Sequence, residues 1–230
     1  MTVQCRVEVL ALDFDGVICD SRHECLELSL RCFAEVSPDR YSLLAGEKMA
    51  EATSFFLEHR GLVRPARNFY LLWVWAACFP ERRLSANDFE AMASEFKSEL
   101  VQFETLFFGN RAEILANDPE AFVSLNPFYS GVVETWQTFS TPTYIVSTKD
   151  SKSIELLLRS KNISVDGVFG FGPNSKRENI AMIIDKHAIN PEALAFVDDN
   201  PLHLWDVACV GVQTFWASWG YGPEDKYEHH

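Results

Sequence analysis

Two different periods of apolar and polar residues run along this chain, and each predicts a different kind of element. Val7–Asp13 is an apolar, branched run that ends in acidic residues, as is typical of a buried parallel strand. Ser21–Val36 instead carries apolar residues at helical spacing and stops at Ser37-Pro38, a helix-ending pair. These patterns predict a strand followed directly by a helix.

The long stretch 41–126 shows no convincing strand pattern and is predicted to form several helices. Ser85 with Asp88 three residues later has the sequence of a helix N-cap. Apolar residues then recur at helical spacing over Phe89–Phe103 and predict one long amphipathic face. Phe69–Phe79 is the longest apolar run, and it is too short for a bilayer, which needs about 20 residues. We therefore expect a buried helix there, with a dimer contact as the alternative.

Short strands and helices alternate after Pro127. Strands are expected at 143–146, 168–171, 193–197 and 210–215, and helices at 131–139, 151–161, 176–186 and 202–209. Such alternation is typical of a parallel sheet covered on both faces, to which the first strand also belongs. We predict an α/β fold with a Rossmann-like parallel sheet core made of 1–20 and 128–230, interrupted by an all-helical insertion at 21–127.

Composition and charge narrow the function classes. Apolar residues make up 47% of the 230 residues, enough for a sizeable core, and the formal net charge is −13. Such an acidic chain repels the phosphates of nucleic acids and anionic lipids, so we expect neither partner. The six cysteines form no Cys-x-x-Cys pair, and no secretory leader pattern is visible. We expect a cytoplasmic protein with reduced thiols.

Polar residues with chemical potential gather where the predicted strands end. They are Asp13, Asp15, Ser147, Thr148, Asp198 and Asp199, with Lys176 at the start of a helix. The carboxyl ends of parallel strands share one rim, where binding sites of open sheets lie. Carboxylates two residues apart in an extended segment point to the same side, and packing them together is costly unless a cation neutralises them. Hard oxygen ligands suit Mg²⁺, so the combination predicts a magnesium site, although each residue alone is as well explained by a turn, a cap or the surface.

These segments resemble, in the right order, the four motifs of the haloacid dehalogenase-like (HAD) superfamily. The segments are Asp13-Phe14-Asp15-Gly16-Val17 with Cys19-Asp20-Ser21, then Ile145-Val146-Ser147-Thr148, Lys176, and Phe196-Val197-Asp198-Asp199. Trp219-Gly220-Tyr221-Gly222 is similar to a tail of phosphoglycolate-phosphatase-like members. The resemblance covers the whole predicted core, and the helical block sits where that superfamily inserts a C1-type cap.

The resemblance implies a catalytic role for several residues. Asp13 is expected to attack phosphorus and form an aspartyl-phosphate, and Asp15 to protonate the leaving oxygen and then activate water. Ser147, Thr148 and Lys176 are expected to bind the phosphoryl group. The resemblance further implies that a magnesium ion joins Asp13, the backbone carbonyl of Asp15 and the acidic pair.

Within the acidic pair the family pattern favours Asp199 as the ligand and Asp198 as its support. Two positions depart from the pattern. His203 stands where many members have another acid, which puts the metal affinity in doubt. Thr148 stands where many have asparagine, which bears on how Asp13 is oriented.

The same residues bear on several alternatives to a phosphatase. A hydrolytic dehalogenase lacks the acid at Asp15, and phosphonoacetaldehyde-type chemistry needs a cap lysine that the context of Lys48 does not support. A receiver domain has its acid pair after the first strand, whereas the pair here comes late. A sugar-phosphate mutase and a catalytically inactive binding protein stay open.

We predict a Mg²⁺-dependent phosphatase for a small phosphorylated metabolite, acting as a monomer or a homodimer. The cap arginines Arg60, Arg64 and Arg67 form a cluster in the sequence, and they are candidates to bind a second anionic group of the substrate.

Overall fold

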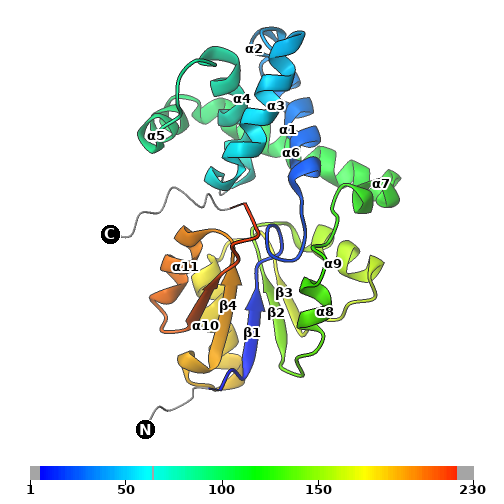
Figure 1. The fold of residues 1–230 in the computed structure, drawn as a ribbon, viewed down its shortest axis with the longest axis vertical. Coiled ribbons are helices and arrows are strands. Elements are labelled where there is room, and N and C mark those ends of the chain that lie inside the picture. Colours follow the sequence, from blue (N-terminus) through cyan, green and yellow to red (C-terminus); the bar gives the residue numbers. More distant parts are fainter. Residues whose placement is uncertain (1–5, 64, 222–230) are drawn as a thin grey trace. The chain divides into compact units, whose positions relative to one another are not determined.

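The structure is a computed structural model that describes residues 6–63 and 65–221 (Figure 1). The chain divides into two compact units, one made of Met1–Ser21 and Asn126–His230 and the other of Arg22–Leu125. In the part of the chain that the structure describes, every strand belongs to the first unit. The first unit is therefore an α/β unit and the second a helical unit.

A five-stranded parallel sheet forms the centre of the α/β unit. Its strands are β1 (Val9–Leu12), β2 (Thr143–Val146), β3 (Gly167–Phe169), β4 (Leu194–Asp198) and β5 (Gln213–Trp216). They pair in parallel in the order β3-β2-β1-β4-β5, which confirms the predicted fold class. Because β1 lies between β2 and β4, the three strands that end in candidate site residues are neighbours.

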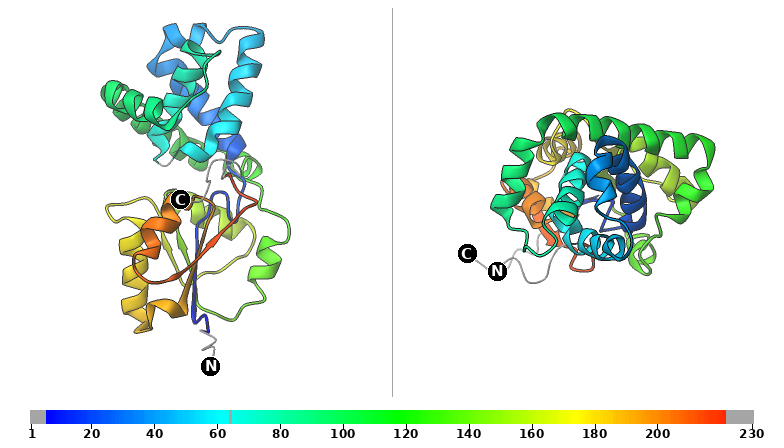
Figure 2. Two further views of the ribbon diagram at one scale, coloured as in Figure 1. Left: turned by 60° about the vertical axis from the view of Figure 1, so that its left-hand side comes forward. Right: turned by 90° about the horizontal axis from the view of Figure 1, so that it is seen from above.

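Helices cover both faces of this sheet (Figure 2). The helices are α8 (Val132–Trp136), α9 (Ser151–Ser160), α10 (Lys176–His187) and α11 (Pro201–Ala208), with a short 3-10 turn at Pro191–Ala193. Helices α10 and α11 pack on one face, and α8 and α9 lie on the other. Each strand and helix predicted after Pro127 is present, with ends that differ by a few residues.

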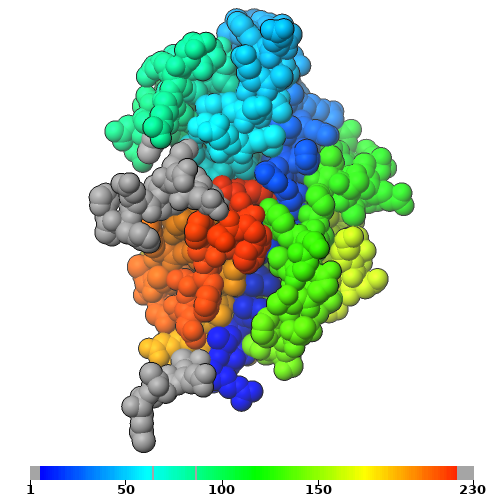
Figure 3. Space-filling view, in the orientation of Figure 1, coloured from blue at the N-terminus to red at the C-terminus, as the bar shows by residue number. Residues whose placement is uncertain are grey.

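Alternate residues of β1 face opposite sides of the sheet, as strand geometry requires. Val9 and Ala11 join an apolar core with side chains of α10 and α11. Leu10 and Leu12 instead line an apolar cavity of about 620 Å³ beside Trp136 of α8. Figure 3 shows this hollow between α8, in green, and the residues after β5, in red. Among the described residues, none of the candidate catalytic groups lines this cavity.

The helical unit is held together by aromatic packing. Its helices are α1 (Arg22–Val36), α2 (Pro38–Ser42), α3 (Glu47–His59), α4 (Phe69–Cys78), α5 (Ala86–Glu95), α6 (Lys97–Asn117) and α7 (Pro119–Ser124), with 3-10 turns at Arg60–Leu62 and Ala66–Asn68. Helix α4 is buried over most of its length, as the apolar run 69–79 predicts. The rings of Phe56 and Trp73 stack at 4.8 Å between centroids.

Two local predictions have different outcomes in this unit. The capping box of Ser85 and Asp88 is confirmed, because each side chain bonds the backbone N–H of the other. The single long face over 89–103 instead spans two helices, since Phe96 leaves the helical region at φ −94° and ψ 31°. Hydrogen bonds from Phe96 to Met92 and from Leu100 to Phe96 continue across this kink, so the apolar side chains on both sides reach one core. No described helix is both long enough and apolar enough to cross a bilayer.

Candidate active site

A lysine joins two carboxylates from neighbouring strand ends at the rim of the sheet. Asp13 follows β1 and Asp198 ends β4, while Lys176 opens α10. The Lys176 Nζ atom lies 2.7 Å from Asp13 Oδ2 and 2.7 Å from Asp198 Oδ2, and all three residues are buried. The structure thus brings together three of the residues that the sequence singles out. Such charge-assisted contacts fix the position of both carboxylates.

Burial and charge act against each other in this cluster. Burial raises the pKa of the Asp13 carboxyl above its ordinary value, and the Lys176 ammonium opposes that rise. Burial pushes the pKa of Asp198 in the same direction, but Lys176 and His203 prevail and leave this pKa lowered. Burial disfavours the Lys176 ammonium, yet both carboxylates outweigh it and the lysine pKa is raised. Lys176 therefore stays cationic and Asp198 anionic near neutral pH.

His203 completes a group that can hold a divalent cation. One ligand atom from each of Asp13, Asp198 and His203 lies within 4.8 Å of the others. His203 Nδ1 is 3.3 Å from Asp198 Oδ2, and this buried nitrogen makes no hydrogen bond. Carboxylate oxygens suit Mg²⁺, whereas an imidazole is a commoner ligand of transition metals. The two acids fit the predicted magnesium site, and the histidine widens the range of divalent ions that fit.

Asp199 has a different environment from its neighbour. Its Oδ2 atom accepts a hydrogen bond of 2.8 Å from the Tyr221 backbone N–H. Gly16, whose φ is +82°, and Gly220 lie so close that a Cβ on either would overlap the Asp199 carboxylate. It is therefore Asp198 that lies with Asp13 and Lys176, whereas the family pattern favours Asp199 as the ligand.

The tail after β5 ties this acidic turn to the loop after β1. Trp219 Nε1 donates to the Val17 carbonyl at 3.1 Å, and the Ser21 N–H donates to the Tyr221 hydroxyl at 2.6 Å. The tail motif of the sequence analysis thus has contacts within the α/β unit. Its last residue, Gly222, lies outside the described residues.

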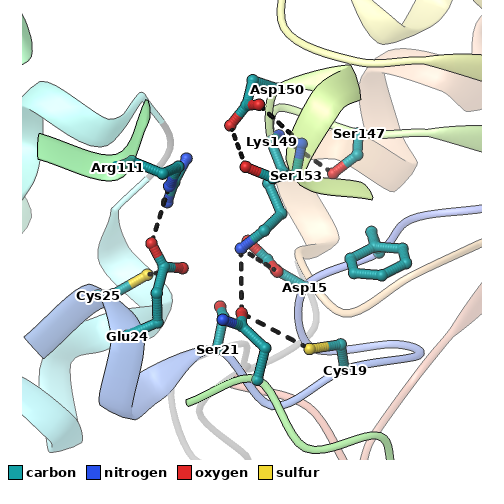
Figure 4. Close-up of polar contacts among 12 residues, drawn as sticks. Asp15, Cys19, Ser21, Glu24, Cys25, Arg111, Ser147, Lys149, Asp150 and Ser153 are labelled. Carbon is teal, nitrogen blue, oxygen red and sulfur yellow. Dashed lines mark hydrogen bonds and ion pairs between the residues drawn. The ribbon is translucent and has the colours of Figure 1, made fainter. Parts of the chain in front are cut away.

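Asp15 contacts a lysine that is not among the site residues predicted from the sequence. Lys149 Nζ lies 3.2 Å from Asp15 Oδ1 and donates a hydrogen bond of 3.2 Å to Asn126 Oδ1. Figure 4 shows the Lys149 side chain pointing toward the Asp15 carboxylate. The signal was available, because Lys149 follows Ser147 and Thr148 at the end of β2.

The two hydroxyl residues after β2 differ in exposure. Ser147 is buried, its N–H donates to the Phe169 carbonyl at 2.9 Å, and its Oγ accepts the Lys149 N–H at 3.2 Å. Thr148 is exposed. Ser147 is therefore the better placed of the two to hold a phosphoryl oxygen beside the end of β1.

The helical unit contains a buried ion pair that the sequence analysis also missed. Arg111 Nε of α6 lies 2.8 Å from Glu24 Oε1 of α1, and both side chains are almost fully buried (Figure 4). Of the arginines proposed for substrate binding, Arg67 pairs with Glu104 at 3.6 Å, and Arg60 lies over the Phe69 ring. The third, Arg64, lies outside the described residues.

Comparison with known proteins identifies the fold. No family model and no curated protein sequence matches the chain. A haloacid dehalogenase-like hydrolase family protein from Streptococcus pneumoniae is similar in structure, with TM-score 0.60, 18% identity, and coverage of 95% of this chain and 88% of that one. A predicted phosphoglycolate phosphatase from Haemophilus somnus has TM-score 0.60 and 16% identity, with 94% and 87% covered.

A predicted phosphatase from Clostridium acetobutylicum has TM-score 0.61 and 11% identity, with 96% of this chain and 89% of that one covered. At these identities the likeness establishes the fold. The chain has the fold of haloacid dehalogenase-like hydrolases, as its motifs predict.

Proposed function

We propose that this chain is a Mg²⁺-dependent phosphatase that hydrolyses a small phosphate monoester through an aspartyl-phosphate on Asp13. One observation supports this proposal above the others: Lys176 joins Asp13 and Asp198 at 2.7 Å each, at the carboxyl ends of adjacent strands. A buried, positioned carboxylate beside a permanent cation suits attack on an anionic phosphoryl group.

The first half of the reaction transfers the phosphoryl group. An Asp13 carboxylate oxygen forms a bond to phosphorus as the bond from phosphorus to the ester oxygen breaks. Asp15 gives its proton to that oxygen, so an alcohol leaves. Lys176 and Ser147 stabilise the charge that gathers on the phosphoryl oxygens in the transition state.

The second half breaks the intermediate. Asp15, now a carboxylate, takes a proton from a water molecule whose oxygen attacks phosphorus. The bond between phosphorus and Asp13 breaks, which releases inorganic phosphate and restores the Asp13 carboxylate and a protonated Asp15. The same aspartate therefore serves as acid and then as base.

Asp13 and Asp198 would hold the magnesium ion, with His203 beside them. Asp199, the next residue on the same turn, is the alternative ligand that the family pattern favours. When bound, the ion offsets the negative charge of the acids and of the phosphoryl group. The fold supports a further proposal, that the helical unit is a cap which selects a small phosphorylated metabolite.

The test is a phosphatase assay with Mg²⁺ over a panel of phosphorylated sugars, nucleotides and acids. We expect wild-type turnover of at least one ester, a loss of about 10³-fold or more in Asp13→Asn, and loss on chelation of the metal. Asp206→Asn is the matched control, because Asp206 is half-exposed and pairs only with Arg177 among the contacts described. A folded Asp13→Asn variant with wild-type rates would exclude the mechanism.

A further inference from the structure

We infer that Lys149 is the positioning residue for Asp15, holding this carboxylate where it can protonate the leaving oxygen. The inference rests on the proposed function and goes beyond it, because it assigns a second lysine of the site to the proton transfers of Asp15. It is carried by the contacts and the burial of Lys149, Asp15 and Asn126.

The Lys149 side chain is fully buried, which is rare for a lysine. It is 0% exposed, so its ammonium needs oxygen partners in place of water. Asn126 Oδ1 provides one partner at 3.2 Å, and Asp15 Oδ1 lies at the same distance. Asn126 is itself buried and accepts a contact of 3.8 Å from Cys19 Sγ. The lysine is therefore fixed at one end by a group that is itself held.

The Asp15 side chain is held by charge but keeps its hydrogen-bonding capacity. Its Oδ1 atom is buried and lies within ion-pair distance of Lys149, yet it has no hydrogen bond. The side chain as a whole is 14% exposed, so part of the carboxyl can be reached. Because Lys149 holds Oδ1 inside the site, the exposed part of the carboxyl keeps a fixed direction, and the other carboxyl oxygen is the one placed to exchange a proton with the leaving group.

This arrangement affects both proton transfers of Asp15, of which kcat/KM reports only the first, the protonation of the leaving oxygen. General acid catalysis contributes about 10²- to 10⁴-fold and needs the acid within hydrogen-bond reach of the oxygen that receives the proton. Lys149 does not itself have to touch the substrate, since it acts through Asp15. Its loss should therefore lower kcat/KM for esters whose leaving alkoxide needs a proton, and spare kcat/KM for esters whose leaving group departs as a stable anion.

The test compares two substrates with Lys149→Met. The leaving group of glycerol 2-phosphate is an alkoxide unless it is protonated, whereas that of p-nitrophenyl phosphate is a stabilised phenolate. We expect kcat/KM to fall about 10- to 100-fold with glycerol 2-phosphate and by less than about threefold with p-nitrophenyl phosphate. Asp15→Asn should show the same pattern, and Lys149→Arg should regain part of the loss. Lys152→Met, a change at an exposed position on α9, is the matched control and should alter neither rate.

The outcomes separate a positioning role from a structural one. Equal losses with both substrates, or no loss with either, would overturn the inference. If Lys149→Met does not fold by circular dichroism, Asn126→Ala replaces it. That change keeps the charge but frees the lysine, and it should give the same selective loss at smaller size. Equal losses there would also overturn the inference. A wild-type protein inactive on all esters tested would instead overturn the proposed function itself.

Discussion

Among the described residues, the α/β unit of the molecule buries more charged side chains than the helical unit does. The α/β unit buries charged groups at one rim of its sheet, namely Asp13, Lys149, Lys176, Asp198 and Asp199. The helical unit buries aromatic rings, among them those of Phe33, Phe56, Tyr70, Trp73, Phe103 and Phe107. Burying a charge costs free energy that apolar packing does not, so charges kept at the strand ends indicate chemistry there. The helical unit has the composition of a part that is stabilised by packing.

One buried ion pair of the helical unit also differs in its bonding from two buried site groups of the α/β unit. In the helical unit, Arg111 Nε and Glu24 Oε1 form a close pair at 2.8 Å, and the guanidinium lies over the Phe107 ring. In the α/β unit, Asp15 Oδ1 and His203 Nδ1 are buried without a hydrogen bond. The first pattern is that of a structural ion pair. The second leaves groups whose hydrogen-bonding capacity a substrate or a metal can use.

The largest expected effect comes from removing the cation that joins two strand ends. Lys176→Met should lower kcat about 10²- to 10³-fold, because it removes a charge that stabilises the phosphoryl oxygens. It should also move the acid limb of the pH–rate profile to higher pH. The pKa of Asp13 is already raised by burial, and Lys176 opposes the rise more strongly than His203 does. Since the nucleophile must be ionised, activity is then lost at a higher pH than in the wild type.

Lys186→Met provides the control for this change. Lys186 is exposed on the last turn of the same helix, and its loss should leave both the rate and the pH profile unchanged. Steady-state kinetics from acid to neutral pH provide the measurement, with circular dichroism as a check on folding. If Lys176→Met kept the wild-type acid limb and a rate near the wild-type value, the buried charges of the α/β unit would no longer indicate chemistry.

A smaller effect, on stability and not on rate, is expected from the buried ion pair of the helical unit. Glu24→Gln leaves the Arg111 guanidinium buried beside a neutral amide, so we expect a loss of about 1.5–3 kcal/mol in the free energy of unfolding. Glu113→Gln is the matched control, because Glu113 faces Arg31 across the same two helices at 4.0 Å with both side chains exposed. It should cost less than about 1 kcal/mol. Urea unfolding of both variants tests the contrast, and equal costs would contradict it.

Much of the architecture could be predicted from the sequence because its signals are local. The branched run before Asp13 and the alternation after Pro127 predict the parallel sheet. The strand ends locate Asp13 and Asp198 on one rim, and the start of the following helix adds Lys176. The kink at Phe96 could not be predicted, because apolar residues keep their spacing across it.

The missed contacts depend on packing between distant segments. Lys149 meets Asp15 and Asn126 only once β2 lies beside β1 and the chain has returned from the helical unit. The different environments of Asp198 and Asp199 have the same origin, since the Tyr221 N–H of the tail donates to the Asp199 carboxylate. No local pattern encodes either pairing, although a charged residue at a strand end is a signal worth following.

The most direct test of the central claim is to trap the covalent intermediate on Asp13. Wild-type protein would be quenched in acid during turnover, reduced with borohydride, and analysed by peptide mass spectrometry. An acyl phosphate is reduced to an alcohol, so the account predicts homoserine at position 13, found only when substrate is present. Turnover at a normal rate with Asp13 unmodified, or with the label on another residue, would contradict it.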